Sequence, residues 1–233
     1  MSQRYFLPQS PAGTTACLDG DEARHVARVM RARPGDQIAV FDGAGHSWPA
    51  VITRIERGQI DLELGLMATE PEPPCRLTVA VALPKGDRQK WLIEKLTELG
   101  VASLVPLTTT RSVAQPTTAA NERLRRGVIE ACKQCGRSRL LEIKAACRFT
   151  DWLAEPHPGT RLLADPAGSP LLSAIRPVPR EVLIAIGPEG GFTPEEVTAA
   201  EQAGFTRVSL GSSILRIETA ALAVAAIIGQ HAG

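Results

Sequence analysis

Apolar and polar residues alternate along three short stretches in the first third of the chain. Residues 37–41, 48–55 and 60–64 show this two-residue period, which is typical of strands with one buried face. Turns that contain glycine, such as Asp42-Gly43, separate the stretches. The pattern predicts a small β-barrel.

One helical pattern interrupts these strands, over residues 21–31. Val26, Val29 and Met30 recur at the spacing of one helix face, so this face is expected to be buried. Another face is expected to carry a basic stripe beside His25, formed at four- and three-residue spacing by Arg24, Arg28 and Arg31.

Beyond residue 74, short apolar runs alternate with helical patterns. Helices are predicted over residues 87–99, with Trp91 among the core residues, and over residues 121–135, because a glycine follows each pattern as at many helix ends. Such alternation predicts an α/β domain with a mostly parallel sheet. Its strands are expected at residues 77–83, 103–107, 140–143, 162–164, 182–186 and 208–210.

The segment of residues 69–74, Thr-Glu-Pro-Glu-Pro-Pro, combines three prolines with two glutamates. Such a segment pairs poorly in a sheet and cannot continue a helix. We therefore predict a linker here, between a domain at residues 1–70 and a domain at residues 74–233.

Charge is unevenly distributed, although the formal net charge of the 233 residues is only +1. Residues 85–148 carry 13 basic and 6 acidic side chains, a net charge of +7, between two mildly acidic segments. Clustered positive charge is typical of a surface for RNA, because binding to phosphates releases their counterions. A solvated helix surface is the alternative for any single residue there.

The chain shows no signal for export or for a membrane span, so we expect a cytoplasmic protein. Its five cysteines are scattered and odd in number, which argues against a disulfide framework. Cys132 and Cys135 form a CxxC sequence, but both sulfurs are expected to face the core from the helix at residues 121–135. Without a second ligand pair or spaced histidines, packing is favoured over a zinc site.

Two loops rich in small residues each lead from a predicted strand into a predicted helix. Residues 186–192 read Ile-Gly-Pro-Glu-Gly-Gly-Phe, and three glycines allow the backbone to wrap closely around a flat ligand such as an adenine-bearing cofactor. A phosphate-binding loop is disfavoured, because P-loop and Rossmann spacings are lacking and Glu189 would repel an anion. A tight turn without a ligand is the remaining alternative.

The helix after the first loop is expected to begin at a capping box, because Thr193, Pro194 and Glu196 stand in the required order. The second loop, residues 210–220, reads Leu-Gly-Ser-Ser-Ile-Leu-Arg-Ile-Glu-Thr-Ala and enters the final apolar helix.

Both loops resemble those of the SPOUT superfamily of knotted methyltransferases and, within it, of the 16S ribosomal RNA uracil-N3 methyltransferases called RsmE. The match spans nearly the whole chain, and the ordered pair of loops carries it most strongly. Further matching residues are Arg4-Tyr5-Phe6, His25, Arg28, Arg31-x-x-Pro-Gly-Asp36, Lys85-Gly86-Asp87, Glu94-Lys95-x-x-Glu98-Leu99-Gly100, Arg111-Ser112, Glu130-Ala131, Gln134 and Gly136-Arg137.

The resemblance implies a PUA-like RNA-binding β-barrel, followed by an α/β SPOUT domain with a deep trefoil knot. It implies a homodimer, without metal, that uses S-adenosylmethionine to methylate N3 of a uridine in 16S ribosomal RNA, uridine 1498 in the usual numbering of that RNA. S-adenosylhomocysteine is the implied product, and the small ribosomal subunit the implied partner. Three loops are expected to hold the cofactor, through Leu163, Ala164, Gly187, Pro188, Glu189, Gly190, Gly191, Leu210, Gly211, Ser212, Ile214, Leu215 and Thr219.

Arg216 and Glu218 are the expected catalytic residues. Methyl transfer to N3 requires alignment of donor and acceptor and removal of the N3 proton. We expect Arg216 to stabilise the deprotonated uracil, with Glu218 orienting Arg216 or acting near the proton. A glutamate favoured by the helix dipole is the alternative for Glu218. RNA contacts are expected from Arg4, Arg24, His25, Arg28, Arg31, Lys85, Arg111 and Arg137.

One departure from the family pattern concerns the second loop. The family usually has Pro-Arg where this chain has Ser212-Ser213, and Thr where it has Ile217. Any role of that arginine in cofactor affinity or RNA positioning is therefore not expected to be carried by the same position in this chain. A 2′-O-ribose methyltransferase of the same superfamily and a non-catalytic RNA-binding assembly protein are the alternative functions.

Overall fold

The computed structural model describes residues 3–112 and 118–231, without the side chains of residues 28, 29 and 118–120. By their contacts the residues form two compact units. The first comprises Met1–Glu72 and Ile129–Leu140, and the second comprises Pro73–Val128 and Leu141–Gly233. The chain thus first changes unit inside the proline-rich segment, and it returns to the first unit later, which the sequence pattern does not predict.

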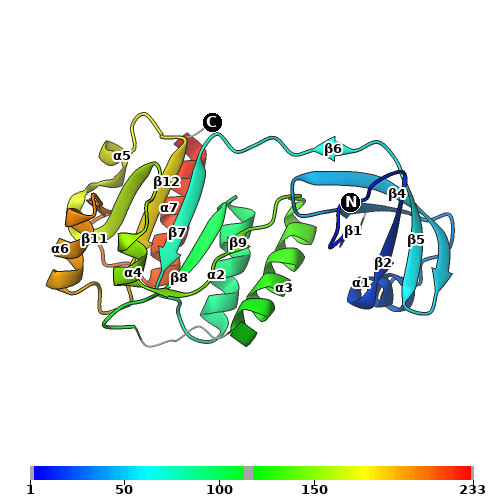
Figure 1. The fold of residues 1–233 in the computed structure, drawn as a ribbon, viewed down its shortest axis with the longest axis horizontal. Coiled ribbons are helices and arrows are strands. Elements are labelled where there is room, and N and C mark those ends of the chain that lie inside the picture. Colours follow the sequence, from blue (N-terminus) through cyan, green and yellow to red (C-terminus); the bar gives the residue numbers. More distant parts are fainter. Residues whose placement is uncertain (1–2, 113–117, 232–233) are drawn as a thin grey trace. The chain divides into compact units, whose positions relative to one another are not determined.

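Unit 1 is built on a curled sheet with the strand order β1-β3-β4-β5-β2, in which β6 pairs with β4 (Figure 1). Residues of β5 are buried at every second position, as alternation predicts. The short strand β6 includes Thr69, so the predicted linker begins inside a strand pair. The strands are β1 (Arg4–Phe6), β2 (Thr15–Asp19), β3 (Gln37–Phe41), β4 (His46–Glu56), β5 (Gln59–Leu64) and β6 (Ala68–Thr69).

The helix predicted over residues 21–31 is wrong in its second half. The α-helix α1 covers only Gly20–Arg24, and His25–Val29 continues as a π-helical turn. Arg31 has a φ of 51°, a left-handed conformation that ends the helical path. Because the π-turn breaks the 3.6-residue spacing, the predicted basic stripe is not continuous.

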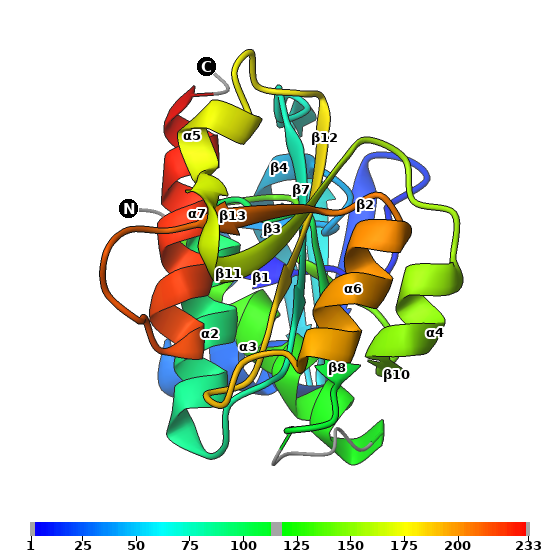
Figure 2. The same ribbon diagram turned by 90° about the vertical axis from the view of Figure 1, so that its left-hand side faces the viewer.

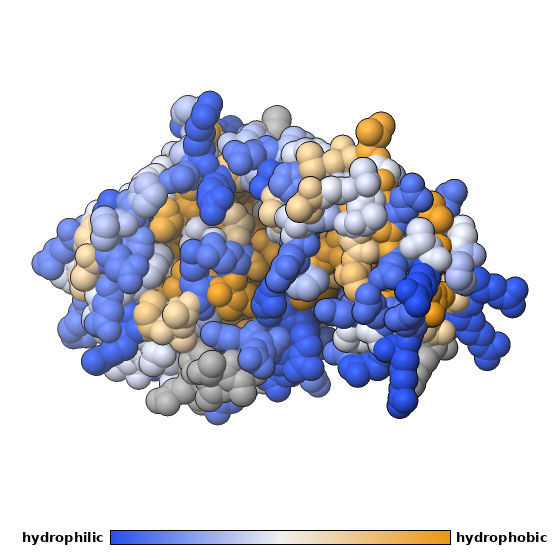
Figure 3. Space-filling model, turned by 45° about the vertical axis from the view of Figure 1, so that its right-hand side comes forward, coloured by the Kyte–Doolittle hydropathy of each residue, from blue (hydrophilic) through white to orange (hydrophobic). Residues whose placement is uncertain are grey.

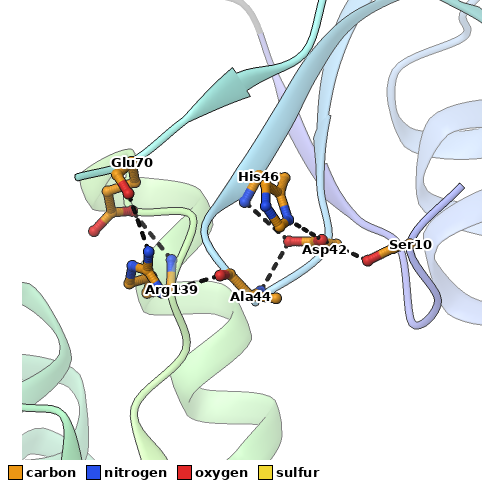
Figure 4. Close-up of polar contacts among 6 residues, drawn as sticks. All are labelled: Ser10, Asp42, Ala44, His46, Glu70 and Arg139. Atoms are coloured by element: carbon orange, nitrogen blue, oxygen red, sulfur yellow. Dashed lines mark hydrogen bonds and ion pairs between the residues drawn. The ribbon is translucent and has the colours of Figure 1, made fainter. Parts of the chain in front are cut away.

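Glu70 and Arg139 fasten the segment after helix α3 (Thr118–Cys135) within unit 1 (Figure 4). The Glu70 carboxylate accepts hydrogen bonds from the backbone N–H groups of Ser138, at 2.5 Å, and Arg139, at 3.1 Å. The Arg139 guanidinium donates to the carbonyl oxygens of Ala44, at 3.1 Å, and Glu70, at 3.2 Å. These bonds satisfy backbone groups that strand pairing leaves open.

Asp42 organises the turn between β3 and β4 (Figure 4). Its carboxylate accepts from the backbone N–H groups of Ala44 and His46 and from the Ser10 hydroxyl, and it bonds to the His46 ring at 2.8 Å. Burial alone would raise the pKa of Asp42, but the bonds from Ser10 and His46 lower it below its ordinary value. Because Ser10 bonds to Asp42 rather than to His46, the trio lacks the order of a hydrolase triad.

Unit 2 contains a sheet with the strand order β10-β8-β7-β12-β11-β13, in which β9 pairs with β8 and all recorded pairs are parallel. This confirms the predicted α/β class. Strands buried on both faces read as continuous apolar runs, as β12 does. The strands are β7 (Arg76–Val81), β8 (Ser103–Thr108), β9 (Glu142–Ile143), β10 (Cys147–Arg148), β11 (Thr160–Pro170), β12 (Glu181–Ile186) and β13 (Thr206–Ser209).

Helices cover both faces of this parallel sheet (Figure 2). Helices α2 and α7 lie on one face, whereas α4 and α6 lie on the other. The predicted C-terminal ends of two helices are confirmed, since Gly100 follows α2 and Gly136 follows α3, with φ values of 80° and 85°. The helices are α2 (Asp87–Glu98), α4 (Phe149–Ala154), α5 (Leu171–Ala174), α6 (Pro194–Gln202) and α7 (Ile217–His231), and none in the described chain is long and apolar enough to span a membrane.

One predicted core residue of α2 is not in the core. Leu92 and Leu96 are fully buried, but Trp91 is 44% exposed. Trp91 stands one position before the buried stripe, on the helix side that faces away from the sheet. On the face drawn in Figure 3, hydrophobic residues (orange) are likewise exposed between hydrophilic ones (blue).

A bulge interrupts β11 where it runs beside β13. The register shifts between Ala164 and Ser169, so that both residues pair with Val208. The intervening residues leave the sheet plane, and Gly168 then passes so close to β13 that a Cβ atom would lie 2.4 Å from the nitrogen of Val208. Only glycine fits this approach without moving one of the two strands.

We predict that Gly168→Ala lowers the free energy of unfolding of unit 2 by about 1–3 kcal/mol, because the added methyl group overlaps the backbone of β13. Gly127→Ala is the matched control. It lies within helix α3, where the nearest atom to a new Cβ is 3.9 Å away, and alanine there should add up to about 1 kcal/mol of stability. Urea unfolding followed by circular dichroism measures both, and equal midpoints for the two variants would contradict the close approach.

Candidate functional site

Three neighbouring strands of unit 2 lead into one pocket. Strands β12, β11 and β13 lie side by side and parallel, so their carboxyl ends meet at one edge of the sheet. Such an edge is where open α/β sheets bind ligands. The pocket is lined by the β11 bulge (Ala164, Asp165, Pro166), by the loop after β12 (Ile186, Gly187, Pro188, Glu189, Gly191, Phe192) and by β13, its loop and α7 (Val208, Leu210, Gly211, Ser213, Ile214, Leu215, Ile217, Ala220).

The loop after β12 folds tightly because of its glycines. A Cβ atom at Gly187 would lie 3.1 Å from the Phe192 ring, so the backbone there packs directly on an aromatic side chain. Gly191 has a φ of 69°, a conformation that favours glycine. The loop therefore offers backbone groups and small apolar surfaces to the pocket rather than bulky side chains.

A capping box ends this loop, as the sequence predicts. The Thr193 hydroxyl accepts from the backbone N–H of Glu196 at 3.2 Å, and the Glu196 carboxylate accepts from the Thr193 N–H at 2.9 Å. The other oxygen of Glu196 accepts from the backbone and the hydroxyl of Thr110. Glu196 thus joins the start of α6 to the segment that follows β8.

Arg111 makes a second connection between the same two segments. Its guanidinium donates to the carbonyl oxygen of Gly190 at 2.6 Å. The bond holds the tip of the loop, although the Arg111 side chain is exposed. On the opposite wall, Asp165 accepts from the Arg207 guanidinium at 3.1 Å, which fixes the β11 bulge.

A second cavity lies beside the first and shares Pro188, Glu189 and Ile217 with it. Its own polar side chains are Lys85, Arg88 and Ser112, which come from the end of β7, the start of α2 and the segment after β8. Its remaining lining is apolar, formed by Ala82, Leu83 and Pro84.

Arg88 contacts two carboxylates at this second cavity. Its Nη1 atom lies 3.3 Å from Glu189 Oε1 and 3.8 Å from Glu218 Oε1. Glu218 is only 7% exposed, and its Oε2 atom is buried without a hydrogen-bond partner in the described chain. A buried carboxylate needs a nearby cation, and Arg88 supplies it.

The structure brings most predicted cofactor residues together around the first pocket. Four of them do not line it. Leu163 is buried between β12 and β13, Gly190 faces Arg111, and Ser212 and Thr219 are exposed outside the lining. The residues that do line it are Ala164, Gly187, Pro188, Glu189, Gly191, Leu210, Gly211, Ile214 and Leu215.

The predicted catalytic pair is not joined in the structure. Arg216 is exposed, between the lining residues Leu215 and Ile217, and no hydrogen bond or ion pair to Glu218 is found within residues 3–112 and 118–231. Arg88 pairs with Glu218 instead. The sequence motif Lys85-Gly86-Asp87 pointed to this region, and Arg88 beside it was a candidate for an RNA phosphate contact, but its pairing with Glu218 was not predicted.

The residues predicted to contact RNA fall in both units. In unit 1, Arg4 donates to the Ser138 hydroxyl at 2.8 Å and to the carbonyl oxygen of Arg137, whose side chain lies 3.5 Å from Glu70. Arg24 pairs with Asp21. His25 and Arg31 are exposed, the Arg28 side chain lies outside the described residues, and Lys85 and Arg111 belong to unit 2.

The CxxC sequence is only half buried. Cys132 faces the core as predicted, but Cys135 is exposed, so the prediction for Cys135 is wrong. Cys135 is the last residue of α3, whereas Cys132 lies almost one turn earlier in the helix. Within the described part of the chain, no three His, Cys, Asp or Glu residues are placed to hold a metal ion.

Comparison with known proteins gives a consistent picture. A family model described as an RNA methyltransferase domain matches residues 71–229, and one described as an RNA methyltransferase PUA domain matches residues 18–65. The chain is 34% identical over 219 residues to a ribosomal RNA small subunit methyltransferase E from Synechocystis sp., covering 91% of this chain and 72% of that protein. A protein of the same name from Mycobacterium bovis is 31% identical over 230 residues, covering 93% and 87%.

Two solved structures extend this similarity to the fold. A ribosomal RNA small subunit methyltransferase E from Neisseria gonorrhoeae, bound to S-adenosyl methionine, aligns with a TM-score of 0.89 and 32% identity over 99% of this chain and 98% of that one. A methyltransferase from Legionella pneumophila in complex with the same cofactor aligns with a TM-score of 0.90 and 29% identity, with the same coverage.

The different exposure of the two cysteines predicts different reactivity. Burial, followed by the nearby Cys135, raises the pKa of the Cys132 thiol to about 12. Since only the thiolate reacts, iodoacetamide should alkylate Cys135 rapidly and Cys132 slowly in the native protein near about pH 8. Trypsin cleaves after Lys133 and separates the two cysteines for mass spectrometry. Similar rates are expected in urea, and similar rates in the native protein would contradict the burial of Cys132.

Proposed function

This chain belongs to the ribosomal RNA small subunit methyltransferase E family, and from that premise we propose that it transfers the methyl group of S-adenosylmethionine to N3 of a uridine in 16S ribosomal RNA. The observation that carries the proposal is the pocket at the carboxyl ends of β11, β12 and β13, lined by all three loops that the resemblance assigns to the cofactor. The small ribosomal subunit, or its RNA, is the proposed substrate.

The lining residues fit S-adenosylmethionine chemically. Apolar side chains such as Ile186, Val208 and Leu210 offer flat surfaces for an adenine ring. Gly187 and Gly211 carry no side chain, so their backbone groups are open to hydrogen bonds from a ligand. Gly211 has a φ of 132°. Asp165, held by Arg207, is a candidate to accept a hydrogen bond from the ligand's hydroxyl or amino groups.

When bound, S-adenosylmethionine supplies a methyl group on a positively charged sulfur. The chain's residues then have two tasks, to align the acceptor nitrogen with this group and to remove its proton. Arg216 at the pocket rim is the proposed contact to the RNA or to the deprotonated uracil.

Unit 1 is the proposed RNA-binding module, since a PUA-domain model covers most of its sheet. The knot and the homodimer, both implied by the family resemblance, stay predictions. Three exposed apolar side chains leave apolar surface on unit 2 in the monomer: Trp91 on α2, Leu99 directly after α2 and Ile214 in the second loop.

The proposed reaction predicts one product. Small subunits from cells that lack this protein, incubated with the purified chain and methyl-labelled S-adenosylmethionine, should yield labelled 3-methyluridine on nucleoside mass spectrometry. Labelled 2′-O-methyl nucleoside would show instead that the chain methylates the ribose and not the base. Absence of label on both subunits and free RNA, with cofactor binding measured by calorimetry, would favour a protein that only binds RNA.

Arg216→Ala should abolish methylation while cofactor binding persists. The reason is that Arg216 is exposed and does not itself line the pocket, whereas loss of a cation at the reacting base costs about 100-fold or more in rate. Single-turnover methylation and calorimetry with S-adenosylmethionine separate the two effects. Near-normal turnover in Arg216→Ala would remove Arg216 from the site.

A further inference from the structure

The second cavity carries chemistry that the cofactor pocket lacks. Lys85, Arg88 and Ser112 can donate hydrogen bonds into it, and Glu189 can accept one. The first pocket, by contrast, is lined mainly by apolar residues and backbone. A small cavity with donors and one carboxylate suits a ligand that has both acceptor and donor atoms on one edge.

The two cavities meet at Glu189. Pro188, Glu189 and Ile217 line both, and Glu189 is the acidic side chain common to the two linings. A group bound in the second cavity would therefore lie next to a group bound in the first. Adjacent sites of this kind are what group transfer between two bound molecules requires.

The imide edge of uracil matches this second cavity. Its O2 and O4 atoms accept hydrogen bonds and its N3–H group donates one, and the imide becomes negatively charged when N3 loses its proton. We propose that the uracil ring enters the second cavity, where Arg88 donates to an imide oxygen and Glu189 accepts the N3 proton. This inference rests on the proposed function and names the groups that perform it.

The step balances without another reagent. The N3–H bond breaks and its proton passes to a Glu189 oxygen. The N3 electron pair forms the bond to the methyl carbon, and the electrons of the carbon–sulfur bond remain on sulfur. The sulfonium loses its positive charge, and one proton is released in its place. Glu189 passes this proton to solvent, because its side chain is 48% exposed.

Glu218 has a different part in this arrangement. It lines neither cavity, and its Oε2 atom is buried without a partner in the described residues. Its other oxygen lies 3.8 Å from Arg88. Glu218 is therefore a positioning residue, which holds the guanidinium at the cavity when Glu189 becomes protonated and its attraction for Arg88 falls.

A contact of Lys85 and Arg88 with an RNA phosphate is the competing interpretation. A phosphate at Arg88 would lie beside both Glu189 and Glu218, and like charges at such short range repel. A neutral imide that becomes anionic only as its proton leaves to Glu189 avoids the repulsion with Glu189. The two interpretations predict different kinetics.

The test measures single-turnover methylation of small subunits at saturating S-adenosylmethionine. Arg88→Ala and Glu189→Gln should each slow the chemical step by about 100-fold, and Arg88→Lys should recover part of this, since the charge stays but the fork of donors is lost. The cofactor Kd of Arg88→Ala should change by less than about threefold, because Arg88 does not line the first pocket. Arg180→Ala and Glu155→Gln, exposed and near the amino ends of β12 and β11, are the matched controls and should stay at the wild-type rate.

Two readouts separate a proton acceptor from a structural residue. The rate of Glu189→Gln should rise by about tenfold per pH unit, because N3 must then ionise before transfer. Subunits with 5-fluorouridine at the target, whose N3–H is more acidic, should rescue Glu189→Gln far more than the wild type. A pH profile parallel to that of the wild type, or equal effects of 5-fluorouridine, would overturn the role of Glu189.

Failure of the inference is distinguishable from failure of the proposed function. If the wild type forms 3-methyluridine but Arg88→Ala keeps its single-turnover rate, the uracil site is wrong and the proposed function stands. Weaker RNA binding in Arg88→Ala with an unchanged chemical step would assign Arg88 to a phosphate. If the wild type forms no 3-methyluridine, the proposed function fails and the inference fails with it.

Discussion

The parallel pairing of β11 with both β12 and β13 is the constraint on which the site depends. This pairing places three loops, separated by many residues in the chain, at one edge of the sheet. The bulge in β11 is equally necessary, because it moves Asp165 and Pro166 out of the sheet and into the pocket wall. Gly168 makes the bulge compatible with pairing, since no side chain fits between the two backbones.

Around this edge, hydrogen bonds add to the apolar packing of Phe192 in fixing the loop after β12. The Glu196 carboxylate accepts three hydrogen bonds, two from Thr110 and one from the Thr193 N–H, while the Glu196 N–H donates to the Thr193 hydroxyl. Arg111 holds the carbonyl oxygen of Gly190. Hydrogen bonds have direction, so they hold a loop in one conformation more strictly than apolar contacts of similar energy. A loop fixed in this way can present backbone groups to a ligand without a large loss of entropy on binding.

The sequence predicts the fold of unit 2 better than that of unit 1. Parallel strands buried on both faces give continuous apolar runs, and helix ends are marked by Gly100 and by the capping box at Thr193. The limits of β11 could not be predicted, because Pro166 and Gly168 resemble loop residues until the pairing with β13 is known. In unit 1, the π-turn after Arg24 leaves the apolar pattern almost unchanged, so periodicity alone cannot detect it.

The site itself was predictable as far as its loops but not as far as its ion pairs. Glycine-rich motifs identify backbone that approaches a ligand, whereas a contact such as that of Arg88 with Glu189 joins residues 101 positions apart and leaves no local signal. The same limit applies to the basic segment of residues 85–148. Its charge suggests RNA binding, yet Arg111, Arg137 and Arg139 donate to or pair with groups of their own chain. Net charge along a sequence therefore overestimates the cations that remain for a phosphate backbone, and the unit that binds RNA has to be identified from side chains whose donors are not already used.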